Sequence, residues 1–195
     1  MPVAESELHF ESAYQLIVAV ILSAQCTDRR VNVTTPSLFK KYPGIQDLAA
    51  ADIEDVYQLI KSISYPRSKA GHLVKMAGMV VRDFGGEIPQ NLDQLMKLPG
   101  VGRKTAAVVA SIAYDKPFIA VDTHVFRVAH RLGLSTASTP SSVALELESN
   151  IPPELRPIAH HWLILHGRYV CTARNPKCGE CGLRAFCKNG PQRTS

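Results

Sequence analysis

Four of the five cysteines lie in one short segment near the end of the chain, and this clustering restricts how that segment can fold. Pro176, Gly179 and Gly182 lie between them and allow the segment to fold back on itself. A chance origin for such a cluster is improbable. The spacing is C-x6-C-x2-C-x5-C, formed by Cys171, Cys178, Cys181 and Cys187.

Three kinds of bonding remain open for this cysteine loop. Four thiolates suit a tetrahedral structural zinc site, although zinc modules often place two close pairs further apart than this loop does. A compact loop that supplies all four thiolates also suits the larger body of an iron–sulfur cubane, and the spacing favours this 4Fe–4S cluster. Free thiols or disulfides are the third possibility, and disulfides are disfavoured in a chain that we expect to be intracellular.

The expectation of a cytoplasmic protein rests on the absence of targeting and membrane signals. The longest apolar run, LIVAVILSA at 16–24, is too short to cross a bilayer. The first ten residues, MPVAESELHF, lack the basic region and cleavage site of a signal peptide. With 195 residues and 46% hydrophobic content, the chain is expected to be globular with a substantial core.

Most of the chain has the sequence pattern of an all-α protein. Within 52–62, apolar side chains recur at helical spacing, as in Ile53, Val56 and Ile60. Turn sequences such as YPG, FGGEIP and NIPPEL separate segments of this kind, and strand alternation is not evident. A break in the helical rhythm near 115–119 indicates a soft domain boundary. The predicted helices are 11–24, 52–62, 68–84, 91–98, 103–114, 122–132, 139–150 and 154–168.

The charge of the chain suits a polyanionic partner. The formal net charge is +5, and basic side chains that displace counterions provide non-specific affinity for nucleic acid. Bases are concentrated at the C-terminal end, where Glu180 is the single acid after residue 167. The bases of that segment are Arg168, Arg174, Lys177, Arg184, Lys188 and Arg193.

The stretch LPGVGRKTAAVVASIAY at 98–114 places a glycine-rich turn before an apolar helix. It is not a P-loop, because Arg103 precedes Lys104 where that motif has glycine, and because a helix rather than a strand precedes the turn. Gly100 and Gly102 can expose backbone N–H groups at a helix N-terminus, which attracts anions such as a DNA phosphate. The alternative is a tight turn before a well-capped helix, with no ligand.

Asp122 lies shortly after this helix, in the apolar context IAVDTH, at a plausible N-cap position. The simplest interpretation is that it caps a helix. The functional interpretation pairs it with Lys104 as a lysine nucleophile, which must be deprotonated to attack. Partial burial, a helix N-terminus and nearby cations favour the neutral amine of such a lysine. The carboxylate would relay protons or stabilise a developing cationic sugar.

Several motifs taken in order resemble those of the endonuclease III family of DNA glycosylases. They are ILSAQCTD at 21–28, RSKA at 67–70, LPGVGRKTA at 98–106, AVDTHVFRV at 120–128, HHWLILHGRYVC at 160–171 and the cysteine loop. The resemblance implies an all-α, two-domain helix–hairpin–helix DNA glycosylase fold. It implies a helical barrel domain over 6–116 and a 4Fe–4S cluster domain formed by 1–5 and 117–195.

The resemblance also assigns functional residues by position. Lys104 would be the nucleophile, Asp122 its acidic partner, and the four cysteines the ligands of the 4Fe–4S cluster. Gln25 falls where the family inserts a glutamine into the gap left by the flipped base. Tyr65 falls in the segment 63–66, where the family wedges an apolar side chain into the duplex, and its ring is able to stack instead. Arg174 and Lys177 are candidates for phosphate contact from their place in the cysteine loop, the alternative being a solvated loop. The full set of candidate DNA contacts is Gln25, Tyr65, Gly100, Gly102, Thr105, Arg174 and Lys177.

The activity implied by the resemblance is that of a bifunctional DNA glycosylase/AP lyase of base excision repair. Such an enzyme removes oxidised pyrimidines through a lysine Schiff base and cuts 3′ to the abasic site by β-elimination. The implied partner is double-stranded DNA with damaged pyrimidines or abasic sites. We expect a monomer in the bacterial cytoplasm, associated with the nucleoid through DNA and with no membrane.

Three other interpretations compete with this one. An adenine-mismatch glycosylase has a related fold but lacks the hairpin lysine and uses a glutamate on the first long helix. Here Lys104 is present, and Val20 occupies the matching place on that helix. A DNA-binding module would use the hairpin and the cysteine loop for binding alone. A zinc-stabilised scaffold would use the cysteines without iron.

Overall fold

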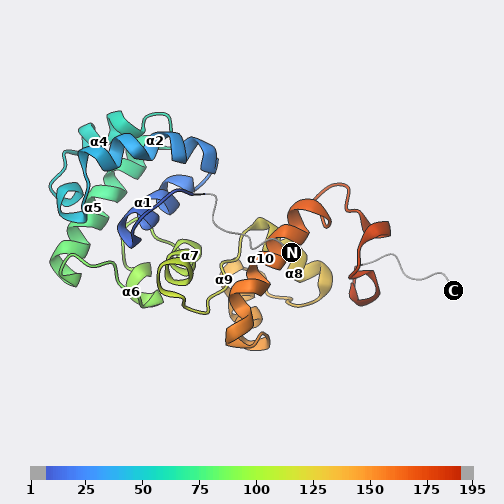
Figure 1. Cartoon of the computed structure of the whole chain (residues 1–195). Helices are drawn as coiled ribbons and strands as arrows, with labels where there is room; N and C mark the ends of the chain where they lie inside the picture. The colour runs from blue at the N-terminus through green and yellow to red at the C-terminus, as the bar shows by residue number, and fades with distance from the viewer. Residues whose placement is uncertain (1–7, 190–195) are drawn as a thin grey trace. The chain divides into compact units, whose positions relative to one another are not determined.

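The computed structural model of the chain describes residues 8–189, and those residues form α-helices and short 3-10 helices with no β-strand (Figure 1). The predicted all-α fold is confirmed. The described residues divide into two compact units, the first ending at Lys116 and the second beginning at Pro117. Residues 1–5, predicted to belong to the cluster domain, lie outside the described residues, as do 190–195.

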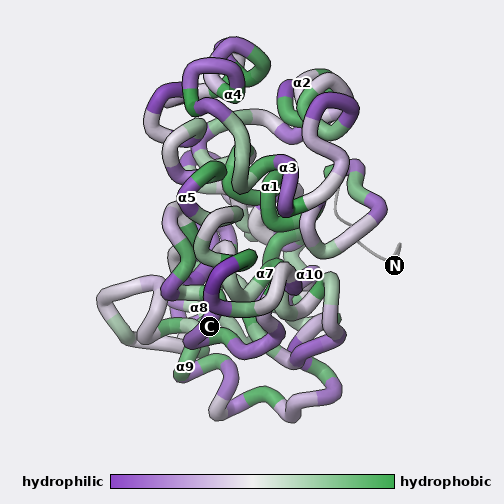
Figure 2. The backbone as a smooth tube through the Cα atoms, turned by 90° about the vertical axis from the view of Figure 1, so that its left-hand side faces the viewer, coloured by the Kyte–Doolittle hydropathy of each residue, from purple (hydrophilic) through white to green (hydrophobic). Residues whose placement is uncertain are grey.

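One apolar helix occupies the centre of the first unit. α1 (Ala13–Ser23) buries residues 16–22 without interruption, and Figure 2 shows it as a largely hydrophobic segment. A helix that is apolar on all sides is suited to a position surrounded by other elements. Accordingly, α1 packs against α2 (Asp28–Lys41), α5 (Pro66–Phe84) and α7 (Arg103–Tyr114).

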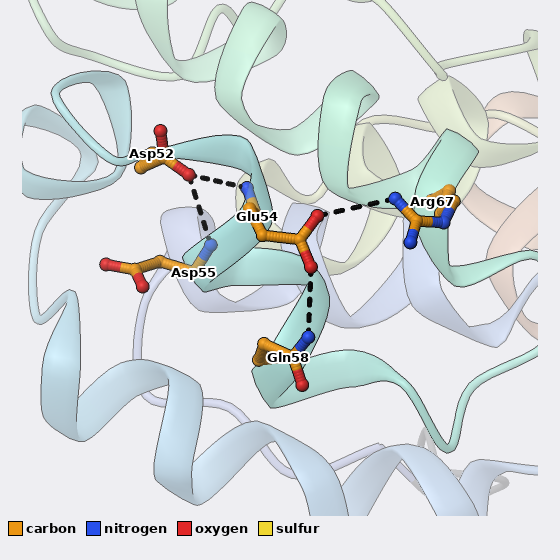
Figure 3. Close-up of polar contacts among 5 residues, drawn as sticks. All are labelled: Asp52, Glu54, Asp55, Gln58 and Arg67. Carbon is orange, nitrogen blue, oxygen red and sulfur yellow. Dashed lines mark hydrogen bonds and ion pairs between the residues drawn. The ribbon is translucent and has the colours of Figure 1, made fainter.

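The remaining helices of the first unit are short and surround this centre. α3 (Ile45–Ala49) and α4 (Ile53–Ile60) pack against α5, and α6 (Leu92–Met96) packs against α7. Figure 3 shows how α4 and α5 are linked at the surface: Glu54 accepts from Gln58 within α4 and forms a 3.3 Å ion pair with Arg67 of α5. In the same view, Asp52 caps α4 by accepting from the backbone N–H of Glu54.

α2 and α3 are not among the helices predicted from the sequence. α2 contains Pro36 and several β-branched residues, which weaken helix propensity when considered alone. Tertiary burial compensates, because Val31 and Leu38 of α2 are fully buried and Thr34 and Thr35 nearly so. The predicted helices elsewhere each overlie an observed one, and 154–168 corresponds to the 3-10 helix η1 (Pro153–Leu155) followed by α10 (Arg156–Tyr169).

The second unit has a small core and an open C-terminal loop. α8 (Thr123–Leu132) packs against α10 and α9 (Pro140–Asn150). From residue 171 to 189 no side chain is buried, and the regular elements there are η2 (Cys178–Glu180) and η3 (Arg184–Phe186). The loop therefore lacks a hydrophobic core. Core residues of this unit include Ile119, Val121, Val125, Val128, Val143, Leu147 and Leu163.

Candidate active site and cysteine loop

The glycine-rich turn between α6 and α7 is a tight hairpin. The N–H of Val101 donates to the carbonyl of Leu98 at 3.1 Å, and both of these side chains are buried. Gly100 has φ +80°, and a Cβ there would lie 2.9 Å from Cβ of His72. Gly102 is the N-cap of α7 and provides no side-chain cap. No side chain at the N-cap therefore accepts from the N–H groups of Lys104 and Thr105, which leaves them for an external acceptor, as an anion-binding hairpin requires.

Replacing Gly100 with alanine is expected to lower the free energy of unfolding by about 1–3 kcal/mol, because the side chain meets both an unfavourable φ and His72. Gly102→Ser provides the matched control. No atom lies within 4 Å of a Cβ at Gly102, and serine is a favoured N-cap. Chemical denaturation of both variants tests the expectation. Equal stability of the two proteins would contradict a steric need for Gly100.

Lys104 lies in the first turn of α7, immediately after this hairpin. The buried face of α7 consists of Ala106, Ala107, Val109 and Ala110, and Lys104 is exposed. Its amine forms no hydrogen bond or ion pair within residues 8–189. The helix N-terminus and a neighbouring cation, Arg103, are present as expected, whereas the partial burial expected of a lysine nucleophile is not found. An exposed amine without a partner remains available to an external electrophile.

Asp122 is the N-cap of α8. Its Oδ1 accepts from the N–H groups of His124 and Val125, both at 2.8 Å, so the capping interpretation is confirmed. Oδ2 has no partner among the described residues, and the side chain is half-buried. The carboxylate is therefore fixed through one oxygen while the other stays available. Asp122 and Lys104 belong to different units, and their pairing stays a prediction.

Arg127 of α8 bonds to residues on both sides of the contact between α8 and α10, next to the Asp122 cap. Its Nη2 donates to the carbonyl of Gly167 at 2.8 Å and lies 3.2 Å from Nδ1 of His124. Its Nε donates to the carbonyl of Cys171 at 3.1 Å. A Cβ at Gly167 would lie 2.9 Å from Cβ of His124, so α8 and α10 approach each other closely. Arg127 therefore links the Asp122 cap to the first cysteine of the loop.

Gln25 and Tyr65 are brought together by the fold, although 40 residues separate them in sequence. The hydroxyl of Ser64 donates to the carbonyl of Gln25 at 2.7 Å. Gln25 and Tyr65 both have positive φ, +54° and +55° respectively, and both side chains are exposed. Thr105 is half-buried beside Lys104, while Arg174 and Lys177 are exposed in the cysteine loop.

The four cysteines of the loop line one cavity of about 30 Å³, together with the apolar side chains of Leu132 and Val170. All four are free thiols. Among residues 8–189, no group of three or more Cys, His, Asp or Glu is placed to hold a metal ion. Four free thiols that line one cavity are the ligand set that a 4Fe–4S cluster uses.

Two further side chains, not predicted from the sequence to contact the loop, face these sulfurs. Arg131 of α8 places Nη1 3.4 Å from Sγ of Cys171 and donates to the carbonyls of Thr172 and Ala173 at 2.7 and 3.0 Å. His166 places Nε2 3.7 Å from Sγ of Cys181. The contacts of Arg131 span about 40 residues, so local spacing carried no signal for them.

Comparison with known proteins gives the family. The model of the HhH-GPD superfamily of base excision DNA repair proteins matches residues 18–153, and that of the iron–sulfur binding domain of endonuclease III matches 171–187. Endonuclease III of Bacillus subtilis is 47% identical over 98% of this chain and 88% of its own length. The chain belongs to the endonuclease III family. Endonuclease III of Escherichia coli is 41% identical over 96% of this chain and 89% of its own.

Solved structures of endonuclease III agree with this assignment. A trapped endonuclease III–DNA covalent intermediate has a TM-score of 0.89 and 44% identity, covering 98% of this chain and 91% of that one. A non-covalent endonuclease III–DNA complex has a TM-score of 0.88 and 45% identity, covering 96% and 88%. The two-domain helix–hairpin–helix glycosylase fold is thus confirmed. As an endonuclease III, the chain is a DNA glycosylase with AP lyase activity.

The cofactor of this endonuclease III is a 4Fe–4S cluster. Cys171, Cys178, Cys181 and Cys187 would hold it, and their shared cavity and free thiols fit that group. The bound cluster would supply the cross-link that the loop lacks in side-chain packing. Among the helices of residues 8–189, none combines the length and apolar character that a membrane crossing requires.

Replacing Cys178 with serine is expected to strip the cluster from the purified protein, because serine removes one of four thiolates. The unaltered protein should carry about four irons and four inorganic sulfides per chain and be brown. Metal and sulfide analysis measures the change, with Cys26→Ser as the control because Cys26 lies outside the loop. One zinc per chain in place of iron would contradict the cubane.

Proposed function

We propose that this endonuclease III removes oxidised pyrimidines from double-stranded DNA with Lys104 as the nucleophile and Asp122 as the acidic partner. The observation that carries the proposal is the exposed amine of Lys104, which has no partner within residues 8–189 and lies in the first turn of α7, directly after the glycine-rich hairpin. It is supported by the likeness to an endonuclease III trapped as a covalent DNA intermediate, since covalent trapping requires a protein nucleophile.

The proposed reaction begins with docking and extrusion. A phosphate of the damaged strand binds the N–H groups of Gly100, Gly102 and Lys104, with Thr105 beside it. The damaged base leaves the stack, which costs least for a weakly paired base. Gln25 fills the gap, and Tyr65 stacks against the opposite strand. Arg174 and Lys177 contact phosphates from the loop that the cysteines hold.

The covalent steps follow at the extruded nucleotide. The Lys104 amine forms a bond to C1′ as the glycosidic bond breaks, and the base leaves with that electron pair. Opening of the sugar ring at O4′ gives a Schiff base between Lys104 and C1′. Loss of a C2′ proton then expels the 3′ phosphate by β-elimination. Asp122 keeps Oδ1 on the α8 cap and uses Oδ2 to stabilise the cationic sugar and to move protons.

The proposal extends to partners and location. DNA with damaged pyrimidines or abasic sites is the proposed partner, with the chain acting as a monomer in the bacterial cytoplasm and on the nucleoid. The exposed cations of the cysteine loop and the net charge of +5 support binding to DNA.

Strand cleavage of a duplex with one thymine glycol tests this function directly. The expected result is a nick 3′ to the lesion, with a protein–DNA adduct after borohydride reduction. An undamaged duplex and an adenine–8-oxoguanine mismatch serve as controls and should stay intact. Binding of damaged DNA without any nick would support a DNA-binding module instead, and cleavage of the adenine mismatch alone would support the adenine glycosylase.

A further inference from the structure

Lys69 is a buried charged side chain that the mechanism above does not use. It lies on α5 with 6% of its surface exposed, among the few polar residues within the core. Its Nζ donates to two backbone carbonyls, those of Leu22 at 2.8 Å and Ala24 at 2.6 Å. Burial lowers the pKa of Lys69. A buried amine in such a place needs partners, and here the partners are backbone groups rather than a carboxylate.

These carbonyls belong to the C-terminal end of α1, just before Gln25. α1 has no basic residue of its own in its last turn, so Lys69 of α5 supplies the cation that complements the negative end of the helix dipole. Ser64 adds a third link by donating to the carbonyl of Gln25. The segment 64–69 therefore holds the carbonyls of three of the four residues from 22 to 25.

The same segment includes Tyr65, whose backbone, like that of Gln25, has a positive φ. Tyr65 has φ +55° and ψ +49° at the N-cap of α5, a left-handed conformation that bulky residues rarely adopt. The N–H of Lys69 donates to the carbonyl of Tyr65 at 3.1 Å. In the first turn of α5, Arg67 also donates to Glu54 of α4 at the surface, at 3.3 Å (Figure 3).

Strained residues persist only where their surroundings determine the backbone on several sides. Gln25 and Tyr65 meet this condition through one shared frame. The Lys69 side chain donates to the carbonyl of Ala24 beside Gln25, and the backbone N–H of Lys69 closes the first turn of α5 on the carbonyl of Tyr65. We infer that Lys69 is a positioning residue that holds the Gln25 turn and the Tyr65 turn as one preformed unit for entry into the DNA duplex. The inference rests on the proposed DNA contacts of Gln25 and Tyr65.

Replacing Lys69 with methionine keeps an unbranched side chain, shorter by one atom, and removes its donors. Base release from a thymine-glycol duplex in a single turnover is expected to slow by roughly 10- to 100-fold, as small misplacements of positioning groups do. Cleavage of a single-stranded abasic oligonucleotide should change less than about twofold, because no base pair has to be opened there. Amide hydrogen exchange in 23–28 should rise. Unchanged duplex rates would overturn the inference.

A double-mutant cycle separates positioning from general weakening of the protein. If Lys69 acts through the Gln25 turn, the loss caused by Lys69→Met should shrink in a Gln25→Ala background. Equal losses in both backgrounds would overturn the inference. A Gln25→Ala or Tyr65→Ala protein with normal duplex activity would instead overturn the proposed DNA contacts themselves.

Ser64→Ala tests the same frame if Lys69→Met fails to fold. Among the described residues, the hydroxyl of this half-buried serine bonds to the Gln25 carbonyl and to no other group. Its loss should therefore slow duplex base release by a few fold while thermal stability stays near that of the unaltered protein. Ser62→Ala is the matched control, because Ser62 contacts Thr34 of α2 and not the Gln25 turn. Equal rates in the two serine variants would contradict the shared frame.

Discussion

Lys104→Gln is expected to abolish base removal and strand cleavage together, and to leave no covalent adduct on borohydride trapping with damaged DNA. The amide of glutamine is not a nucleophile and forms no Schiff base, so both reactions lose the same atom. Glutamine is a good helix former, and the position is exposed in the first turn of α7. The fold should therefore survive, which circular dichroism and thermal melting check.

Lys97→Gln is the matched control for this variant. Lys97 is exposed at the C-cap of α6 in the same hairpin, so its loss removes the same charge without removing the proposed nucleophile. Binding of damaged DNA should weaken slightly in both variants, since each loses one cation near the phosphates. Trapped adduct should disappear in Lys104→Gln alone. Normal adduct in that variant would show that another amine attacks the sugar.

The helices predicted from the sequence are those whose capping residues or apolar spacing can be seen within the segment itself. α7 was placed with its observed ends because Gly102 precedes it and an apolar run follows. α2 was missed because Pro36 and the threonines argue against a helix locally, while burial of Val31 and Leu38 decides the outcome. Burial depends on distant elements, which a single sequence does not display.

The residues of the candidate site likewise fall into those that local sequence predicts and those that depend on distant contacts. The Asp122 cap follows from residue type and position, and the cysteine pattern pointed to its cofactor from spacing and the family motifs together. The roles of Arg131 and Lys69 depend on contacts that span about 40 residues or more, so spacing carried no signal for them. Whether Lys104 meets Asp122 also depends on how the two units are arranged, and it stays a prediction.

Asp122→Asn is expected to slow base removal by roughly 100-fold or more while keeping the fold and DNA affinity. Asparagine caps a helix about as well as aspartate, so the bonds to the N–H groups of His124 and Val125 are retained. The variant removes only the negative charge, which the mechanism needs to stabilise a cationic sugar and to move protons. Single-turnover base release and equilibrium DNA binding measure the two effects.

Asp122→Ala separates the cap from the chemistry. Alanine loses both capping bonds, and the free energy of unfolding should fall by about 1 kcal/mol, whereas Asp122→Asn should leave it nearly unchanged. Both variants lose the carboxylate, so their rates of base release should fall to a similar level despite their different stabilities. A normal rate in Asp122→Asn with a reduced rate in Asp122→Ala would show that Asp122 acts only as a helix cap, because activity would then follow the capping bonds and not the charge.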